Sequence, residues 1–197
     1  SISNVDIIDL EGDGKDEVAI ALTGPEAVVT IIGEQNGGDR RFGEVLTFLL
    51  QDFSTSAGDV HVAGVDFERD GRSDLIVFSP ERNVLRVQSF LNSGGILGIG
   101  PGLLHRVPGM SNILSKSIAR LSWNNDATDD LLIPFQSGHV VSLSMGQQGI
   151  DVQELGIEAG PLSDLKYADF NHDGLSDLLF VSGQQGVITV SYASQGG

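Results

Sequence analysis

The feature that most constrains this chain is an acidic, glycine-containing loop that leads at once into a short apolar run. Its clearest form is D-x-N-x-D-G-x-x-D at residues 169–177, followed by Leu178–Val181. Related loops lie at residues 9–17 (loop one), 66–74 (loop two) and, in a divergent form, 122–130 (loop three), with 169–177 as loop four. Loops that recur roughly every 50 residues indicate a repeat protein.

The apolar patterns around these loops predict strands. Leu75–Phe78 after loop two is apolar at consecutive positions, which is typical of a strand covered on both faces. Residues 187–192 alternate in the period of two that marks a strand. Four antiparallel strands per repeat, with no helix between them, predict an all-β fold: a β-propeller or propeller segment of four blade-like units, the last incomplete. The approximate repeats are residues 1–57, 58–113, 114–160 and 161–197.

The loops place several oxygen donors near one point. Acids or amides stand at positions 1, 3 and 5, a glycine at position 6 allows a sharp bend, and an acid follows at position 9. Several hard oxygens that converge suit Ca²⁺. The predicted ligands are Asp9, Glu11, Asp13, Lys15 and Glu17 in loop one; Asp66, Glu68, Asp70, Arg72 and Asp74 in loop two; and Asp169, Asn171, Asp173, Leu175 and Asp177 in loop four.

Lys15, Arg72 and Leu175 would contribute their backbone carbonyls to these three sites. Loop three has Ser122 at position 1 and Ala127 in place of the glycine, so we expect it to be empty. The alternative for every loop is a turn whose carboxylates only cap backbone N–H groups. An EF-hand is excluded, because its position 12 requires a glutamate and the loop requires flanking helices.

Composition narrows the classes of function. The formal net charge of −16 argues against nucleic acid as a partner. The chain has no cysteine, so disulfide and thiol chemistry are excluded. No apolar run approaches the length of a membrane span, so no membrane insertion is expected. The sequence has neither a G-x-S-x-G nor an H-E-x-x-H motif. The match of Ser163–Lys166 to S-x-x-K lies at the start of an expected strand, so we expect no catalysis.

These loops and strands resemble the FG-GAP/VCBS repeat family, whose blades also build the propeller of the integrin α-subunit. The resemblance rests on the acidic loops, on the D-L-[IL]-[VF]-type strands after them and on the closing G-x-V-x-V strands. It extends over essentially all of the 197 residues. Glu11 and Glu68 depart from the family's usual aspartate or asparagine at position 3, and Glu17 departs from its aspartate at position 9.

The resemblance implies structural Ca²⁺ between the first two strands of a blade, and an extracytoplasmic, non-catalytic module for interaction or adhesion. Its partner would be another protein or further copies of the chain that complete the propeller. Two other functions remain open. One is a lectin-like propeller that binds a glycan through Trp123, Tyr167 or Tyr192. The other is an accessory propeller of a larger secreted hydrolase or lyase.

Overall fold

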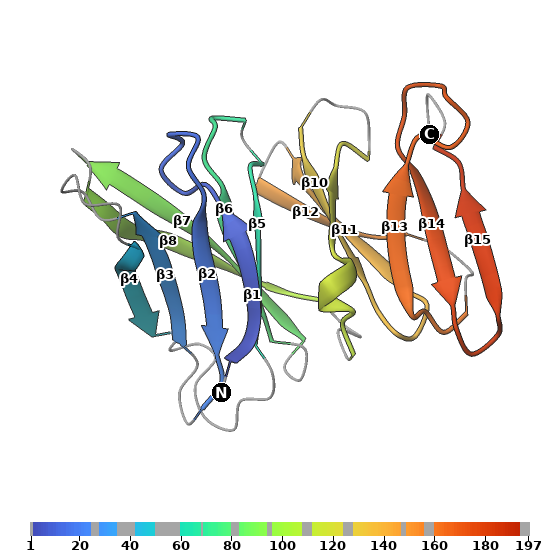
Figure 1. Cartoon of the computed structure of the whole chain (residues 1–197), viewed down its shortest axis with the longest axis horizontal. Helices are drawn as coiled ribbons and strands as arrows, with labels where there is room; N and C mark the ends of the chain where they lie inside the picture. The colour runs from blue at the N-terminus through green and yellow to red at the C-terminus, as the bar shows by residue number, and fades with distance from the viewer. Residues whose placement is uncertain are drawn as a thin grey trace. The chain divides into compact units, whose positions relative to one another are not determined.

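The computed structural model shows an all-β chain, which confirms the all-β part of the fold predicted from the sequence (Figure 1). It describes residues 2–24, 28–34, 42–49, 60–67, 69–79, 83–93, 96–107, 112–123, 128–146, 149–155 and 160–193. The chain divides into two compact units, Ser1–Asp66 with Asp70–Met110 and Phe67–Arg69 with Ser111–Gly197.

Four antiparallel sheets make up the described chain, two in each unit. The first unit contains the sheet β1 (Ile2–Ile8), β2 (Glu17–Leu22), β3 (Val28–Glu34) and β4 (Phe42–Leu49), and the sheet β5 (His61–Val65), β6 (Asp74–Ser79), β7 (Val84–Ser93) and β8 (Ile96–Arg106). The second unit contains the sheet β9 (Ala119–Leu121), β10 (Asp130–Pro134), β11 (Val140–Gly146) and β12 (Gly149–Leu155), and the sheet β13 (Asp164–Ala168), β14 (Asp177–Ser182) and β15 (Val187–Ser191).

Within every sheet the strands follow chain order, so each strand pairs with the next one along the sequence. Short connections between antiparallel neighbours explain this order, because hairpins need few residues. The acidic loops one, two and four each join the first and second strands of a sheet. They therefore lie at equivalent places in the first, second and fourth repeats.

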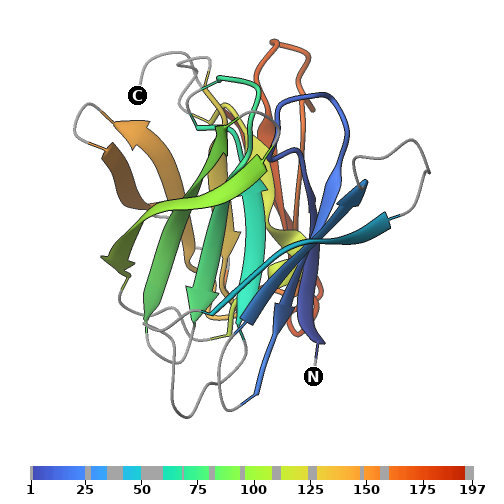
Figure 2. The same ribbon diagram turned by 90° about the vertical axis from the view of Figure 1, so that its left-hand side faces the viewer.

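The two sheets of the first unit share one core. Ala19 and Ala21 of β2 are fully buried, and they pack in one cluster with Leu75 and Val77 of β6. The first strands of these sheets, β1 and β5, lie side by side (Figure 2). Burial of a leucine or valine such as Leu75 or Val77 stabilises the fold by about 1.5–3 kcal/mol relative to exposure, and burial of an alanine methyl group contributes less.

Polar side chains of β1 hold β5 at a fixed position. Asn4 Oδ1 accepts the Val62 N–H at 2.6 Å, and Asp6 Oδ2 accepts the Gly64 N–H at 2.8 Å. A Cβ atom on Gly64 would lie 2.1 Å from Ile8 Cγ2, so only glycine permits this approach. The sheets are thus joined by side chain-to-backbone bonds as well as by apolar packing.

The second unit repeats this arrangement with a short helical turn at its entrance. Leu132 of β10 packs in one cluster with Leu178 and Phe180 of β14. The 3-10 turn η3 (Ser115–Ser117) precedes β9, and Ser117 Oγ donates a hydrogen bond to Asp164 Oδ1 at the start of β13.

The third sheet has four strands and the last has three in the described part of the chain. Closure of these sheets around a common axis as a propeller stays a prediction. Within the ranges that the structure describes, no helix has both the length and the apolar character needed to cross a membrane.

Candidate metal-binding loops

Loop four shows how the acidic loops are built. Asp169 stands at position 1, and its two carboxylate oxygens accept the N–H groups of Asp173 at 3.1 Å and Gly174 at 3.0 Å. Asn171 Oδ1 also accepts the Asp173 N–H, at 3.0 Å, and Asp173 Oδ1 accepts the Leu175 N–H at 2.9 Å. The side chains at positions 1, 3 and 5 are therefore all turned toward the backbone of their own loop.

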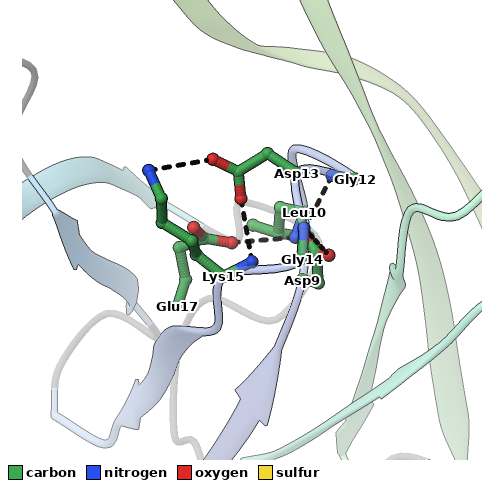
Figure 3. A network of polar contacts seen from close by, with 7 residues as sticks. All are labelled: Asp9, Leu10, Gly12, Asp13, Gly14, Lys15 and Glu17. Atoms are coloured by element: carbon green, nitrogen blue, oxygen red, sulfur yellow. Dashed lines mark hydrogen bonds and ion pairs between the residues drawn. The ribbon is translucent and has the colours of Figure 1, made fainter.

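Loop one repeats this pattern (Figure 3). Asp9 accepts the N–H groups of Gly12 at 2.7 Å and Gly14 at 2.9 Å, and Asp13 accepts the Lys15 N–H at 2.9 Å. The Lys15 ammonium also lies 3.2 Å from Asp13 Oδ2, in a solvent-exposed ion pair.

In loop two, as in loop four, the first aspartate accepts the N–H groups of positions 5 and 6, whereas in loop one it accepts those of positions 4 and 6. Asp66 accepts the N–H groups of Asp70 at 3.2 Å and Gly71 at 2.9 Å. Asp70 Oδ1 accepts the Arg72 N–H at 2.9 Å. Loops that differ in sequence thus share one network, in which position 1 caps position 6 and position 5 caps position 7.

Backbone conformation explains why glycine stands at position 6. Gly14, Gly71 and Gly174 have φ angles of 77°, 84° and 88°, in the left-handed region that favours glycine. Position 4 is also left-handed, with φ of 54° at Arg69 and 62° at His172. The two left-handed residues fold the loop back toward its first aspartate.

The acid at position 9 has a different role from those at positions 1 and 5. Glu17 Oε2 accepts the Leu10 N–H at 2.8 Å, Asp130 Oδ2 accepts the Trp123 N–H at 2.7 Å, and Asp177 Oδ2 accepts the Phe170 N–H at 2.9 Å. In each case the acceptor begins a strand and the donor is at position 2. All three acids are buried. This bond closes the neck of the loop, and we call the group the neck acid.

The sequence did not indicate the specific bond of the neck acid to position 2. It predicted position 9 as a metal ligand, which stays a prediction, and gave capping of backbone N–H groups as the general alternative. A signal was present, because Asp130 keeps this acid in loop three where the glycine and the first carboxylate are lost. A residue retained in a loop that has lost its other donors indicates a structural role. In loop four the second oxygen of Asp177 also accepts the Ala193 N–H, at 2.9 Å.

The electrostatics of loop one depend on the burial of its neck acid. Burial raises the pKa of Glu17, although the Leu10 N–H opposes the rise, and the nearby carboxylates of Glu11, Asp9 and Asp13 raise it further. The pKa of Asp13 is lowered, chiefly by the hydrogen bond from the Lys15 backbone N–H. A cation in this loop would reduce the repulsion that acts on Glu17.

A direct link between loops one and two was also absent from the sequence interpretation. The Ser73 N–H donates to the Asp9 carbonyl at 2.6 Å, and the Asp9 N–H donates to Ser73 Oγ at 3.3 Å. A Cβ atom on Gly12 would lie 2.8 Å from Arg72 Cγ. Nothing in a linear sequence shows that position 8 of one loop meets position 1 of another.

The predicted ligands are brought together in part. In loops one, two and four, positions 1 and 5 share the inside of the loop, joined by Asn171 at position 3 of loop four. The neck acids Glu17 and Asp177 lie at the base of loops one and four. Glu68 lies outside the described residues, as do residues 124–127 of loop three. Among the residues that are described, no three His, Asp or Glu side chains are gathered closely enough to hold a metal ion.

The donor set nevertheless fits a hard cation in its chemistry. Carboxylate and amide oxygens are the ligands that Ca²⁺ prefers. A carboxylate oxygen that accepts one N–H keeps a further lone pair, so the capping bonds do not exhaust the donors. The residues that would hold the ion are the acids at positions 1 and 5, the donor at position 3 and the carbonyl at position 7.

The aromatic side chains considered as glycan contacts lie in different settings. Trp123 is partly buried and packs against the core of the second unit. Tyr167 and Tyr192 are exposed by 46% and 61%. The two tyrosines, and not the tryptophan, are the accessible rings.

Comparisons with known proteins found a similar fold but no matching family. A scan against protein-family models and a search of curated proteins found no match. A solved structure of a rhamnogalacturonan lyase (PL11) from Bacillus licheniformis has a similar fold, with a TM-score of 0.55 and 13% sequence identity. The likeness covers 90% of this chain but only 39% of the lyase chain. At this identity the likeness supports the all-β fold alone.

Proposed function

We propose that the chain is a non-catalytic, calcium-stabilised protein-interaction module, with its sheets arranged as the blades of a β-propeller or propeller segment. The observation that carries this proposal is the common network of loops one, two and four. In each, acids at positions 1 and 5 are held on the inside of a left-handed turn by the same backbone N–H groups. The module would act outside the cytoplasm, where calcium is abundant.

The proposed role of the ion follows from thermodynamic linkage. Each loop joins the first two strands of a sheet, so the loop geometry exists only when the sheet is folded. An ion that binds only the folded loop raises the free energy of unfolding by about 1.4 kcal/mol at ten times its dissociation constant. Three such loops would add about 4 kcal/mol, a large fraction of the stability of an ordinary domain.

Titration of the metal-free chain with Ca²⁺ tests this proposal. We expect heat of binding in calorimetry and a higher melting temperature in calcium than in EDTA. Replacement of the position 5 acids together, by Asp13→Ala, Asp70→Ala and Asp173→Ala, should remove both effects. Asp126→Ala is the matched control, because it removes the same acid from loop three. A chain that neither binds calcium nor melts higher in its presence would overturn the proposal.

A second candidate is an accessory part of a larger polysaccharide-processing enzyme. It is favoured by the structural likeness to part of a lyase, together with the exposed rings of Tyr167 and Tyr192. This candidate predicts that the chain binds rhamnogalacturonan, and that Tyr192→Ala weakens this binding. A glycan array without binding would leave the interaction module as the better explanation.

A further inference from the structure

Two sheet faces are apolar and yet open to solvent. One is the face of the first sheet that carries Val5 and Ile7 of β1, which are 48% and 61% exposed and pair in register with Ile20 and Val18 of β2. An antiparallel sheet with one solvated face normally places polar residues there. We call this surface the head face.

The other open surface lies on the last sheet. Ile188 of β15 is 65% exposed and pairs with Val181 of β14, and Val190 pairs with Leu179. We call this surface the tail face. Val18, Ile20, Leu179 and Val181 are only partly buried. Their strand neighbours Ala19, Ala21, Leu178 and Phe180, which point to the opposite faces, are at most 1% exposed.

The stacked sheets inside each unit follow one rule of orientation. Counting from the first loop residue, the strand after the loop begins at position 9. Positions 11 and 13 of β2, Ala19 and Ala21, share a core with positions 10 and 12 of β6, Leu75 and Val77.

The second unit obeys the same rule. Position 11 of β10, Leu132, shares a core with positions 10 and 12 of β14, Leu178 and Phe180. In both units, then, the odd positions of the earlier sheet meet the even positions of the later sheet. Under this rule, the side of a sheet with even positions faces the sheet before it, and the side with odd positions faces the sheet after it.

The two open faces are complementary under this rule. The head face carries even positions of β2, Val18 and Ile20, and so has the side that receives an earlier sheet. The tail face carries odd positions of β14, Leu179 and Val181, and so has the side that receives a later sheet. One chain therefore presents both halves of the contact that its own sheets make in pairs.

We propose that the head face of one copy binds the tail face of a second copy, so that β13–β15 stacks on β1–β4 as one blade stacks on the next. This inference names the partner of the proposed interaction module and rests on that function. The contact is heterologous, so the copies would assemble into a ring or an open chain. The net charge of −16 opposes association, so added salt should strengthen it.

Sedimentation velocity of the chain, from low micromolar to several hundred micromolar, tests the proposal with one variant on each face. Ile7→Lys alters the head face and Ile188→Glu alters the tail face, and both side chains are exposed in the single chain, so folding should be preserved. Each variant alone should lose association by about tenfold or more, because a charge would be buried in an apolar contact. Leu103→Lys, at a residue of β8 that is 57% exposed, is the matched control and should associate like the wild type.

A mixture of the two variants separates head-to-tail binding from other arrangements. The intact tail face of Ile7→Lys can bind the intact head face of Ile188→Glu, so the mixture should form a complex of two chains and nothing larger. A wild type that stays monomeric at every concentration overturns the proposal. So does a dimer that survives Ile188→Glu, because it would join two head faces.

The experiment is run in calcium and in EDTA, with circular dichroism to confirm folding. Association that persists in EDTA, in a chain that fails to bind calcium, would leave this inference standing while the calcium role falls. Calcium binding by a chain that remains monomeric would support the calcium role and overturn the head-to-tail contact.

Discussion

At the scale of single residues, a few glycines decide whether neighbouring segments can approach. Gly138 has a φ of 103°, and a Cβ atom there would lie 2.4 Å from the Gly160 carbonyl oxygen. Gly186 also has positive φ, at 63°, but a Cβ atom there would meet nothing within 4 Å. Comparison of Gly138 with Gly186 separates the free-energy cost of backbone strain from that of a steric collision.

We predict that Gly138→Ala lowers the free energy of unfolding by about 2 kcal/mol or more, because strain and collision add. Gly186→Ala should cost about 1 kcal/mol, from strain alone. Chemical unfolding of the two variants measures the difference. Equal losses would show that the segment around Gly160 moves aside without cost.

The carboxylate of Asp164 gives one residue a defined pH dependence. Burial alone would raise its pKa, but the hydrogen bonds from the Ser117 hydroxyl, the Lys166 ammonium and the Leu165 N–H outweigh burial and lower it. An acid whose pKa is lower in the folded state stabilises the fold above its unfolded pKa, near pH 4. That stabilisation is lost as the pH falls through the folded pKa.

Asp164→Asn should therefore destabilise the chain at neutral pH, and the difference from the wild type should shrink as the pH falls below about 4. Urea unfolding of the wild type and the variant, from neutral pH to below about pH 4, measures this difference in the free energy of unfolding. Ser117→Ala removes a hydrogen bond that the Asp164 carboxylate accepts. In a Ser117→Ala background, the pH-dependent loss of stability caused by Asp164→Asn should therefore be smaller. A penalty that is independent of pH would mean that the ionised carboxylate contributes nothing.

At the scale of elements, the neck acid explains how loops one, three and four are joined to the strands that follow them. We predict that Asp130→Ala costs about 2 kcal/mol, because the Trp123 N–H loses its buried acceptor. Loop three is expected to hold no ion, so the loss should be equal in calcium and in EDTA. Asp129→Ala removes the same charge from the neighbouring position and should change stability little. A loss seen only in calcium would identify Asp130 as a ligand.

The strands and loops show which features of the fold could be predicted from the sequence and which could not. The recurrence of acidic loop and apolar run predicted the antiparallel all-β fold, because period and turn chemistry are local properties. The capping bonds of Asp9 and Asp169 were foreseen only as an alternative to metal binding. The contact between Ser73 and Asp9 could not be foreseen, because it depends on how two sheets stack. The bond from the neck acid to position 2 was covered only by the general alternative of capping carboxylates, because an acid before a strand can serve either purpose. That position 9 also holds a metal stays a prediction.

At the scale of the whole molecule, charge and fold act against each other. Folding brings the loop acids together, and a net charge of −16 makes the compact state repel itself. Monovalent salt screens this repulsion over about 10 Å at 0.1 M, so salt should raise the melting temperature in EDTA. Three bound calcium ions would bring the net charge to about −10 and neutralise the charge where it is densest.

We therefore predict that the melting temperature rises by a few degrees between low and moderate NaCl in EDTA, and rises less in calcium. The variant with Asp13→Ala, Asp70→Ala and Asp173→Ala lacks the position 5 acids, so its salt dependence in calcium should match its dependence in EDTA. Differential scanning calorimetry at several salt concentrations measures each slope. If the wild-type slope is unchanged by calcium, the repulsion lies outside the loops, and the acids of the loops are held apart by their backbone caps alone.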